Sequence, residues 1–314
     1  MEKGYVWLTG VSGFIGRHLS PALEKTFFQV RYFTNNKDAK TTLDNKKLSR
    51  HYIDFSREDD VRRNIELYGL PDILVHLGWG AMTEPSSKEH LTANVEASKT
   101  LINTLFKAGL EKFVFLSSVN EYGGREGSLS EDMAPEGRLT AYAEGKTRVA
   151  SFGFEQASKY NKKFISIRLF NTFGSGQREG SLINKLYDCY RQNIKPKLGP
   201  CEHFRDYIHV SEVVEGIKLI CGINESTIVN LGSGKAIKLK DFVILFWKSL
   251  GGIPDDLKFG AYSMREGEPE QPYVFANMDR LKRFTGWAPS LSIEEGIRLT
   301  IEGLKAKEGD GNCS

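Results

Sequence analysis

Two residues whose types could do chemistry, Tyr142 and Lys146, stand four positions apart in this sequence. In a helix, side chains at this spacing share one face, so the phenol would lie beside the ammonium. The unperturbed pKa of tyrosine is about 10, and a neighbouring cation lowers that pKa because it stabilises the phenolate. Such a pair can move a proton on or off an alcohol oxygen while a cofactor carries the hydride. The spacing alone is common by chance, so this prediction depends on finding a cofactor site.

A glycine-rich turn near the start of the chain supplies that candidate cofactor site. The apolar run Tyr5–Thr9 predicts a buried strand, and it is followed by Gly10, Gly13 and Gly16 and then by a helical pattern. Glycines let the backbone approach a pyrophosphate, and the N-terminus of the following helix presents N–H groups to it. The spacing is GxxGxxG rather than GxGxxG, and we favour a dinucleotide site over a plain glycine turn.

The end of the second predicted strand, Phe28–Phe33, bears on the choice between NAD and NADP. An acidic residue usually binds the ribose diol of NAD at this place, whereas here the chain reads Thr34-Asn35-Asn36-Lys37. The missing acid favours NADP slightly, with Asn35, Asn36 or Lys37 near the 2′-phosphate, although asparagine also binds diols. His51–Phe55 is a third predicted strand, and its Asp54 is either a partner of the adenine amino group or a solvated loop acid.

Strands and helices alternate over the first 175 residues, which predicts a parallel sheet with helices on both faces. We therefore predict an α/β fold, a Rossmann-type doubly wound parallel sheet with a smaller C-terminal α/β substrate-binding lobe. The dinucleotide-binding domain is expected to cover 1–175 with a return segment at about 206–231. The lobe is expected to cover 176–205 and 232–307, and residues 308–314 are expected to fray. Helices are expected at Lys88–Leu110, Tyr142–Tyr160 and Ser292–Lys305.

Composition narrows the class of protein. The chain has 314 residues, 40% hydrophobic and 26% charged, as in an ordinary globular protein. Its net charge of +3 gives no reason to expect a nucleic-acid partner. Its four cysteines are scattered without a CxxC pattern, so we expect neither a disulfide framework nor a metal site. No apolar run approaches the roughly 20 residues that span a bilayer, and the N-terminus lacks a signal peptide's core. We expect a cytoplasmic protein without a membrane partner.

These motifs together resemble the extended short-chain dehydrogenase/reductase family, in the NAD-dependent epimerase/dehydratase branch that modifies nucleotide-activated sugars. The resemblance extends from about Gly4 to Leu304. Besides the glycine turn and the Tyr142–Lys146 pair, it is carried by Ser118 four residues before Tyr122-Gly123, Arg168 with Asn171, Arg205–Val210, Asn230–Gly234 and Arg265–Pro269.

The resemblance implies a role for each matching residue. Tyr142 would be the acid/base, Lys146 would hold the nicotinamide ribose and lower the tyrosine pKa, and Ser118 would hydrogen-bond the reacting sugar oxygen. NADP or NAD would be held by Gly10, Ser12, Gly13, Phe14, Ile15, Gly16, Asn35, Asp54, Phe55, Leu77, Gly78, Trp79, Asn94, Tyr142, Lys146 and Leu169. The nucleotide-diphosphate sugar would be held by Asn120, Asn171, Leu182, Arg205 and Arg265. The two arginines also suit a diphosphate on chemical grounds, because guanidinium groups are planar, bidentate and permanently charged.

Val119 and Asn120 depart from the dehydrating members of this family, which carry an Asp-Glu pair there. Dehydration needs an acid for the leaving hydroxyl and a base for the α-proton, and Val119 is neither. Hence 4,6-dehydration is disfavoured, and we expect hydride transfer at C4 of the sugar, by a 4-ketoreductase or a C4 dehydrogenase. The alternatives are a nucleotide-sugar 4-epimerase with tightly held NAD, and a non-catalytic NAD(P)-binding regulator or scaffold. The resemblance also implies a homodimer through the Lys88–Leu110 and Tyr142–Tyr160 helices.

Overall fold

A seven-stranded parallel sheet forms the centre of the molecule. The computed structural model describes residues 4–35, 42–43, 46–47, 50–263 and 273–311. Every neighbouring pair in the sheet is parallel. The strand order β12-β9-β7-β6-β1-β2-β5 is the doubly wound order, which confirms the predicted Rossmann-type sheet. The strands are β1 (Tyr5–Thr9), β2 (Gln29–Thr34), β5 (Arg50–Tyr52), β6 (Ile73–His76), β7 (Lys112–Ser118), β9 (Lys163–Leu169) and β12 (Thr227–Leu231).

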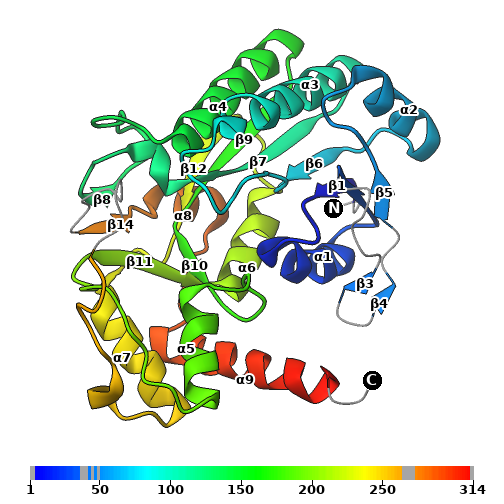
Figure 1. Cartoon of the computed structure of the whole chain (residues 1–314). Coiled ribbons are helices and arrows are strands. Elements are labelled where there is room, and N and C mark those ends of the chain that lie inside the picture. The colour runs from blue at the N-terminus through cyan, green and yellow to red at the C-terminus, as the bar shows by residue number, and fades with distance from the viewer. Residues whose placement is uncertain (1–3, 36–41, 44–45, 48–49, 264–272, 312–314) are drawn as a thin grey trace.

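Helices cover both faces of this sheet (Figure 1). On one face lie α1 (Phe14–Thr26) and α6 (Val210–Ile220), and on the other lie α2 (Glu58–Tyr68), α3 (Ala93–Ala108) and α4 (Ala141–Tyr160). Successive strand residues point to opposite faces, so Val6 and Leu8 pack in the core with α1 and α6 while Trp7 packs in the other core. Because both faces are buried, the strands read as nearly continuous apolar runs.

The helix predicted over Lys88–Leu110 is interrupted. A short 3₁₀ turn, η1 (Lys88–His90), comes first, and α3 begins only at Ala93. Gly109 ends α3 as predicted, with a left-handed φ of 111°. The predicted helix over Tyr142–Tyr160 is α4, whose Thr140 cap accepts a hydrogen bond from Ala143 N at 3.2 Å.

A second sheet and a group of helices form the part of the molecule below the main sheet in Figure 1. The sheet has the order β10-β11-β13, made of β10 (Asn171–Phe173), β11 (Phe204–His209) and β13 (Ala236–Lys238). Its core also contains α5 (Leu182–Arg191), α7 (Leu239–Leu250) and α9 (Ile293–Gly311). The remaining elements are β3 (Thr42–Leu43), β4 (Lys46–Lys47), η2 (Val119–Tyr122), β8 (Gly127–Leu129), η3 (Pro254–Asp256), β14 (Val274–Ala276) and α8 (Asp279–Thr285).

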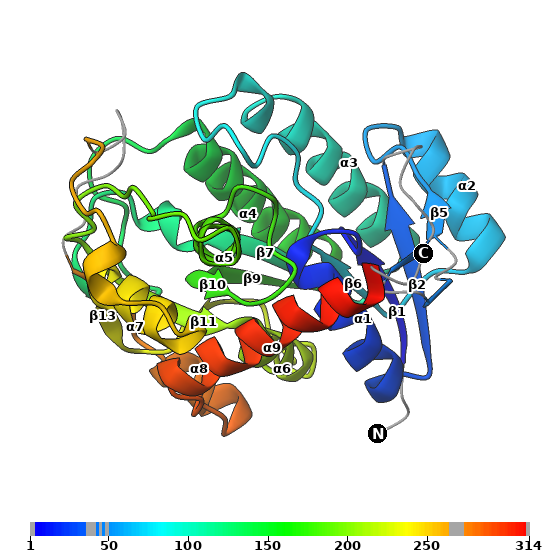
Figure 2. The same ribbon diagram turned by 60° about the horizontal axis from the view of Figure 1, so that its bottom comes forward.

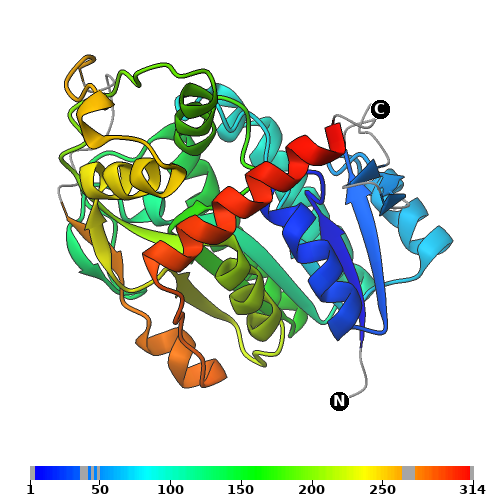
Figure 3. The same cartoon turned by 90° about the horizontal axis from the view of Figure 1, so that it is seen from below.

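The terminal helix α9 runs from this second part across α6 toward α1 (Figure 2), as the view from below also shows (Figure 3). It continues to Gly311, beyond the point at which the sequence was expected to fray. In the described part of the chain, no helix combines the length and the apolar character needed to cross a membrane.

The buried Asp206 joins β11 to two other segments. Its carboxylate accepts hydrogen bonds from Ser233 N at 2.6 Å, Gly234 N at 2.9 Å and Ala276 N at 3.0 Å. A Cβ on Gly232 would lie 2.6 Å from this carboxylate, which explains a glycine there. The sequence motifs around Asp206 and around Gly232 therefore contact each other through this carboxylate.

Candidate functional site

Ser118, Tyr142 and Lys146 come together at the carboxyl end of β7. Ser118 is the last residue of that strand, and its side chain hydrogen-bonds the Tyr142 phenol. Lys146 lies one turn further along α4, and its Nζ donates to the Leu116 carbonyl of β7 at 2.7 Å. The structure thus brings the three residues predicted to be catalytic into one site, through a strand end and the first turns of a helix.

The electrostatics of this site differ from the expectation that Lys146 lowers the pKa of Tyr142. Burial raises the pKa of Tyr142 to about 12, and the hydrogen bond from Ser118 opposes that rise. Burial also lowers the pKa of Lys146 to about 7, against an opposing effect of the Glu121 carboxylate. The Lys146 Nζ is 5.9 Å from the Tyr142 ring centroid. The expectation was wrong for this state of the site, because burial of the phenol is the largest effect on its pKa and Lys146 is not among the groups that shift it.

Lys146 lies instead between two aromatic rings. Its Nζ is 3.9 Å from the centroid of the Trp79 ring and 4.7 Å from that of Phe115. The Trp79 indole donates to His90 Nδ1 at 2.9 Å, and His90 Nε2 bonds the Glu84 carbonyl at 2.9 Å. His90 Nδ1 is therefore the acceptor and Nε2 the protonated nitrogen of a neutral imidazole.

Gly145 is one of two glycines inside α4, where a glycine costs up to about 1 kcal/mol relative to alanine. A Cβ at this position would lie 2.2 Å from the His90 carbonyl oxygen and 3.3 Å from the Trp79 ring. The missing side chain therefore lets η1 pack directly on α4, which seats Trp79 and His90 beside Tyr142 and Lys146.

A cavity of about 780 Å³ lies next to this site, over the start of α1. Gly10, Gly13 and Gly16 of the glycine turn line it, so it lies where the sequence predicts a dinucleotide. Gly10 has a φ of +74°, and a Cβ there would lie 2.8 Å from Gly78 N. The α1 helix begins at Phe14, and no side chain caps its N-terminus. Its first backbone N–H groups are therefore available to a ligand in the cavity. The residues present thus fit the diphosphate of NAD or NADP, which would supply or accept a hydride when bound.

Most residues predicted to hold the cofactor line this cavity. They are Gly10, Ser12, Gly13, Phe14, Ile15, Gly16, Asn35, Phe55, Leu77, Gly78, Trp79 and Asn94. Tyr142 and Lys146 are not among its lining residues, and the Trp79 indole, which does line it, lies over the Lys146 ammonium. Leu169 is absent from its lining as well, and so is Asp54, whose carboxylate accepts from Ser56 N at 3.0 Å. Asn36 and Lys37 lie outside the described residues.

The cavity also has lining residues that sequence reasoning missed. Arg17 and Ser98 reach it from α1 and α3, and a loop after β10 adds Gly176 to Glu179 and Ser181. Arg17 follows the last glycine of the motif directly, which is a signal that the sequence did offer. The loop after β10 carries no local pattern that points to the glycine turn. His76 lines the cavity as well, from the end of β6, and its buried ring bonds Thr9 Oγ1 at 2.7 Å.

The residues predicted to hold the sugar nucleotide are spread over several elements. Asn171 pairs with Tyr207 in the β10–β11 register, which places it near Arg205 on β11, and Leu182 begins α5. The Arg205 guanidinium donates to the Phe204 carbonyl at 2.9 Å. Asn120 lies beside Ser118, just after the carboxyl end of β7. Arg265 lies outside the described residues.

Glu121 follows Val119 and Asn120, which stand where the dehydrating members carry an Asp-Glu pair. Its carboxylate is not free to act on a substrate. It is 2% exposed, accepts from Arg168 Nε at 2.9 Å and also bonds the Ser117 hydroxyl. The acid displaced from the dehydratase pattern is thus engaged in a buried ion pair, which adds to the argument against dehydration.

A parallel doubly wound sheet with a glycine turn under α1 and a Ser-Tyr-Lys group at its carboxyl edge defines a nicotinamide-dinucleotide-binding class of protein. The model of the NAD dependent epimerase/dehydratase family matches residues 6–232, and the chain belongs to this family. The resemblance seen in the sequence is therefore confirmed.

Two curated relatives and one solved structure extend this comparison. The chain is 26% identical to dTDP-4-dehydro-6-deoxyglucose reductase of Escherichia coli, over 98% of this chain and 99% of that protein. It is 26% identical to CDP-abequose synthase of Salmonella typhimurium, over 96% of this chain and 99% of that protein. The UDP-glucose 4-epimerase of Thermotoga maritima, solved with UDP-glucose, superposes with a TM-score of 0.85 at 22% identity, covering 97% and 99% of the two chains.

Proposed function

We propose that this protein is an NAD(P)-dependent oxidoreductase that transfers a hydride at C4 of a nucleotide-activated sugar, as a 4-ketoreductase or a C4 dehydrogenase. The observation that carries the proposal is the hydrogen bond between Ser118 and Tyr142, one helical turn from Lys146 and beside the cavity that the glycine turn lines. A reductase among the full-length relatives supports it. Asn171, Arg205 and Arg265 would hold the diphosphate of the sugar nucleotide.

In this reaction the chain's own residues handle the proton. A pKa near 12 keeps the Tyr142 phenol protonated at neutral pH, ready to donate to a carbonyl oxygen at C4. Ser118 holds that oxygen by a second hydrogen bond. The nicotinamide supplies the hydride when it is bound. This protonated phenol suits the direction of ketone reduction, in which the oxygen gains a proton.

Replacing Tyr142 by phenylalanine tests the proposal. We expect Y142F to lower kcat by about 10²- to 10⁴-fold, the usual contribution of a general acid, with the Kd for NAD(P)H unchanged. The matched control is Y160F, which removes a phenol at the far end of α4 that bonds Asn103. NADPH consumption equal to the amount of a 4-keto sugar nucleotide supplied identifies the reductase. A kcat of Y142F within a few-fold of wild type would contradict the proposal.

A 4-epimerase is the second candidate, because the solved structure that superposes at a TM-score of 0.85 is a 4-epimerase with the same fold. The two activities differ in how the cofactor is held. An epimerase returns the hydride to the same sugar, so purified protein that carries nicotinamide and needs none added favours it. A requirement for added NAD(P)H in every turnover favours the reductase.

A further inference from the structure

A second, smaller pocket opens beside Ser118 and Tyr142, and it is separate from the cofactor cavity. It has a volume of about 210 Å³ and is lined by Asn120, Gly123, Gly124, Glu136, Gly137, Arg138, Leu139 and Thr140. We call it the Arg138 pocket. Among the described residues it shares no lining residue with the cofactor cavity. It is smaller than the ~300–1,000 Å³ of sites that hold whole drug-sized ligands, so it fits one substituent of a substrate.

The Arg138 pocket adjoins the reacting atoms. Asn120 stands two residues beyond Ser118, and its N–H donates to the Ser118 hydroxyl at 3.2 Å. Thr140 stands two residues before Tyr142 and caps the helix that carries it. A sugar whose C4 oxygen contacts both Ser118 and Tyr142 therefore places a neighbouring substituent close to this pocket.

The floor of the Arg138 pocket is fixed backbone. Gly124 N donates to the Glu136 carbonyl at 2.8 Å, and Glu136 N donates to the Tyr122 carbonyl at 3.1 Å. Gly123 has a φ of +66°, and a Cβ there would lie 2.2 Å from the Glu136 oxygen. These two segments touch without side chains between them, so the pocket exists before a substrate arrives.

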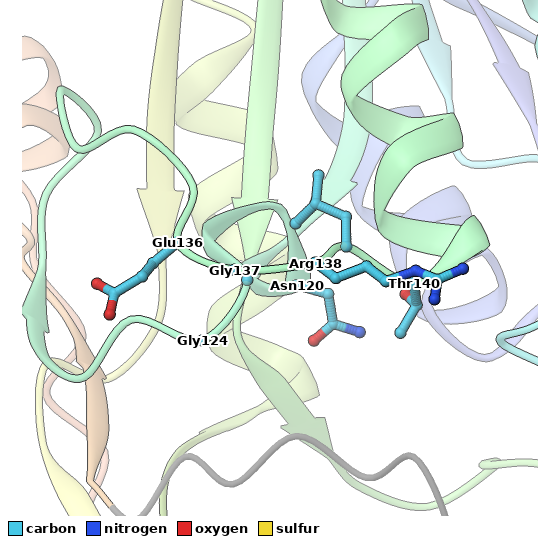
Figure 4. Close-up of a pocket in the computed structure, with 8 residues that line it drawn as sticks. Asn120, Gly124, Glu136, Gly137, Arg138 and Thr140 are labelled. Carbon is cyan, nitrogen blue, oxygen red and sulfur yellow. The ribbon is translucent and has the colours of Figure 1, made fainter.

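The charge that the Arg138 pocket offers to a ligand is the positive charge of Arg138. The Glu136 side chain points away from Asn120 and Arg138 (Figure 4), and its carboxylate lies 3.5 Å from the Arg125 guanidinium. The Arg138 side chain runs in the other direction, toward Thr140 (Figure 4). Within the part of the chain that the structure describes, the Arg138 guanidinium has no hydrogen-bond or ion-pair partner.

From this geometry we propose that the Arg138 pocket is a specificity subsite for an anionic group of the sugar, a carboxylate next to the reacting carbon, as in a nucleotide-activated uronic acid. A guanidinium binds a carboxylate through two parallel hydrogen bonds, and the Asn120 amide adds a neutral donor. This proposal rests on the proposed function for the position of C4. It names a substrate class that the Ser-Tyr-Lys group alone does not select.

A matched pair of ligands tests the subsite, since UDP-glucuronate and UDP-glucose share the nucleotide and the diphosphate and differ in the carboxylate. Their Kd values are measured by calorimetry on the NAD-loaded protein, and turnover is followed separately by nicotinamide absorbance. We expect wild type to bind UDP-glucuronate at least about tenfold more tightly, the worth of one charge-assisted pair. R138A should lose this preference while its Kd for UDP-glucose stays within about twofold, and R138K should keep part of it, because lysine retains the charge without the bidentate geometry.

The control is R148A, which removes an exposed arginine of α4 that pairs with Glu144 outside the pocket. R148A should keep the full preference. Equal loss for both ligands in R138A would mean that Arg138 holds the diphosphate, which would overturn the proposal, as would equal binding of the two ligands to wild type or no binding of UDP-glucuronate. A preference that depends on Arg138 without any turnover would support the subsite and contradict the proposed function. Turnover without a preference for UDP-glucuronate would support the proposed function and contradict the subsite.

Discussion

The indole of Trp79 lies over the ammonium of Lys146, with 3.9 Å between the ring centroid and Nζ. A cation over an aromatic face is stabilised by about 0.5–2 kcal/mol, depending on its desolvation. Trp79 lines the cofactor cavity and Lys146 does not. The nicotinamide half of a dinucleotide would therefore meet Trp79 before it reaches the lysine, and we expect the ring to change its environment when the cofactor binds.

Tryptophan emission reports this change. We expect NADPH to quench emission of the wild-type protein, because Trp79 is the tryptophan among the cavity's described lining residues and dihydronicotinamide accepts indole excitation energy. Most of the quenching should disappear in W79F. The matched control is W287F, which removes an indole packed against the α1–α6 core. Full quenching in W79F would show that the cofactor binds away from this ring.

A second prediction concerns Gly145. Helix propensity alone predicts that G145A is stabilising by up to about 1 kcal/mol. The structure predicts the opposite, because the new Cβ would lie 2.2 Å from the His90 carbonyl. We expect a loss of about 1–3 kcal/mol in the free energy of unfolding, the usual cost of overpacking, measured by urea denaturation. S151A, on the exposed face of the same helix, should change it by no more than about 0.5 kcal/mol. A stabilised G145A would contradict the close approach of η1.

The contrast between these residues shows what could be predicted from sequence. The strand at Tyr5–Thr9 and the glycine turn after it are local patterns, so they and the Rossmann-type sheet were predictable. The helix that carries Tyr142 was predictable for the same reason. The hydrogen bond between Trp79 and His90 joins two side chains of the connection between β6 and α3, whose path depends on how α4 packs, and no periodicity encodes it.

The electrostatics of the site were harder to predict than its composition. Sequence spacing placed Lys146 near Tyr142, and from this the sign of the tyrosine pKa shift was predicted wrongly. Burial of the phenol raises this pKa and the Ser118 hydrogen bond opposes the rise, and both depend on segments that lie far from Tyr142 in sequence. Arg138 was overlooked because an arginine in a Gly- and Pro-containing linker looks like any solvated charge. Its place in a pocket with Asn120 and Thr140 emerges only once the linker is seen to end at the Tyr142 helix.

Arg17 leads to a third prediction, on cofactor choice. It lines the cofactor cavity together with Thr34 and Asn35, at the end of β2 where an NAD site usually has an acid. Its Nε is buried and has no hydrogen-bond partner among the described residues. We propose that this guanidinium binds the 2′-phosphate of NADP. A charge-assisted hydrogen bond contributes about 1.5–3 kcal/mol, so R17A should weaken NADPH binding by roughly 10- to 150-fold.

R17A should change the Kd for NADH by no more than about twofold, because NADH has no 2′-phosphate for the guanidinium to bind. K25A, an exposed lysine in the last turn of the same helix, removes an equal charge and should change neither Kd. Both are measured by calorimetry at one fixed salt concentration. If R17A weakened NADPH and NADH alike, the arginine would be acting on the shared diphosphate and the choice of NADP would lose its main support.

The last prediction concerns stability in acid, through His209 at the start of α6. Burial, with a smaller effect of the nearby His18, lowers the pKa of His209 to about 4. Its Nδ1 accepts from Ser211 N at 3.3 Å, a bond that protonation of Nδ1 would break. Between the unfolded pKa of about 6.5 and the folded value, the unfolded chain binds a proton that the folded chain does not. The free energy of unfolding should therefore fall by about 1.4 kcal/mol per pH unit from this residue, or about 3 kcal/mol at pH 4.5.

Replacing His209 by asparagine removes the titration and keeps a side chain that favours the N-cap position. We expect H209N to be as stable as wild type or somewhat less stable at pH 7.5, where the histidine is neutral and packs on Phe173 with 5.3 Å between ring centroids. Between pH 6.5 and 4.5 it should lose about 3 kcal/mol less than wild type, measured by urea denaturation at each pH. Parallel pH profiles of the two proteins would mean that His209 accepts its proton in the folded state without cost, and that its burial at the start of α6 does not exclude the charged form.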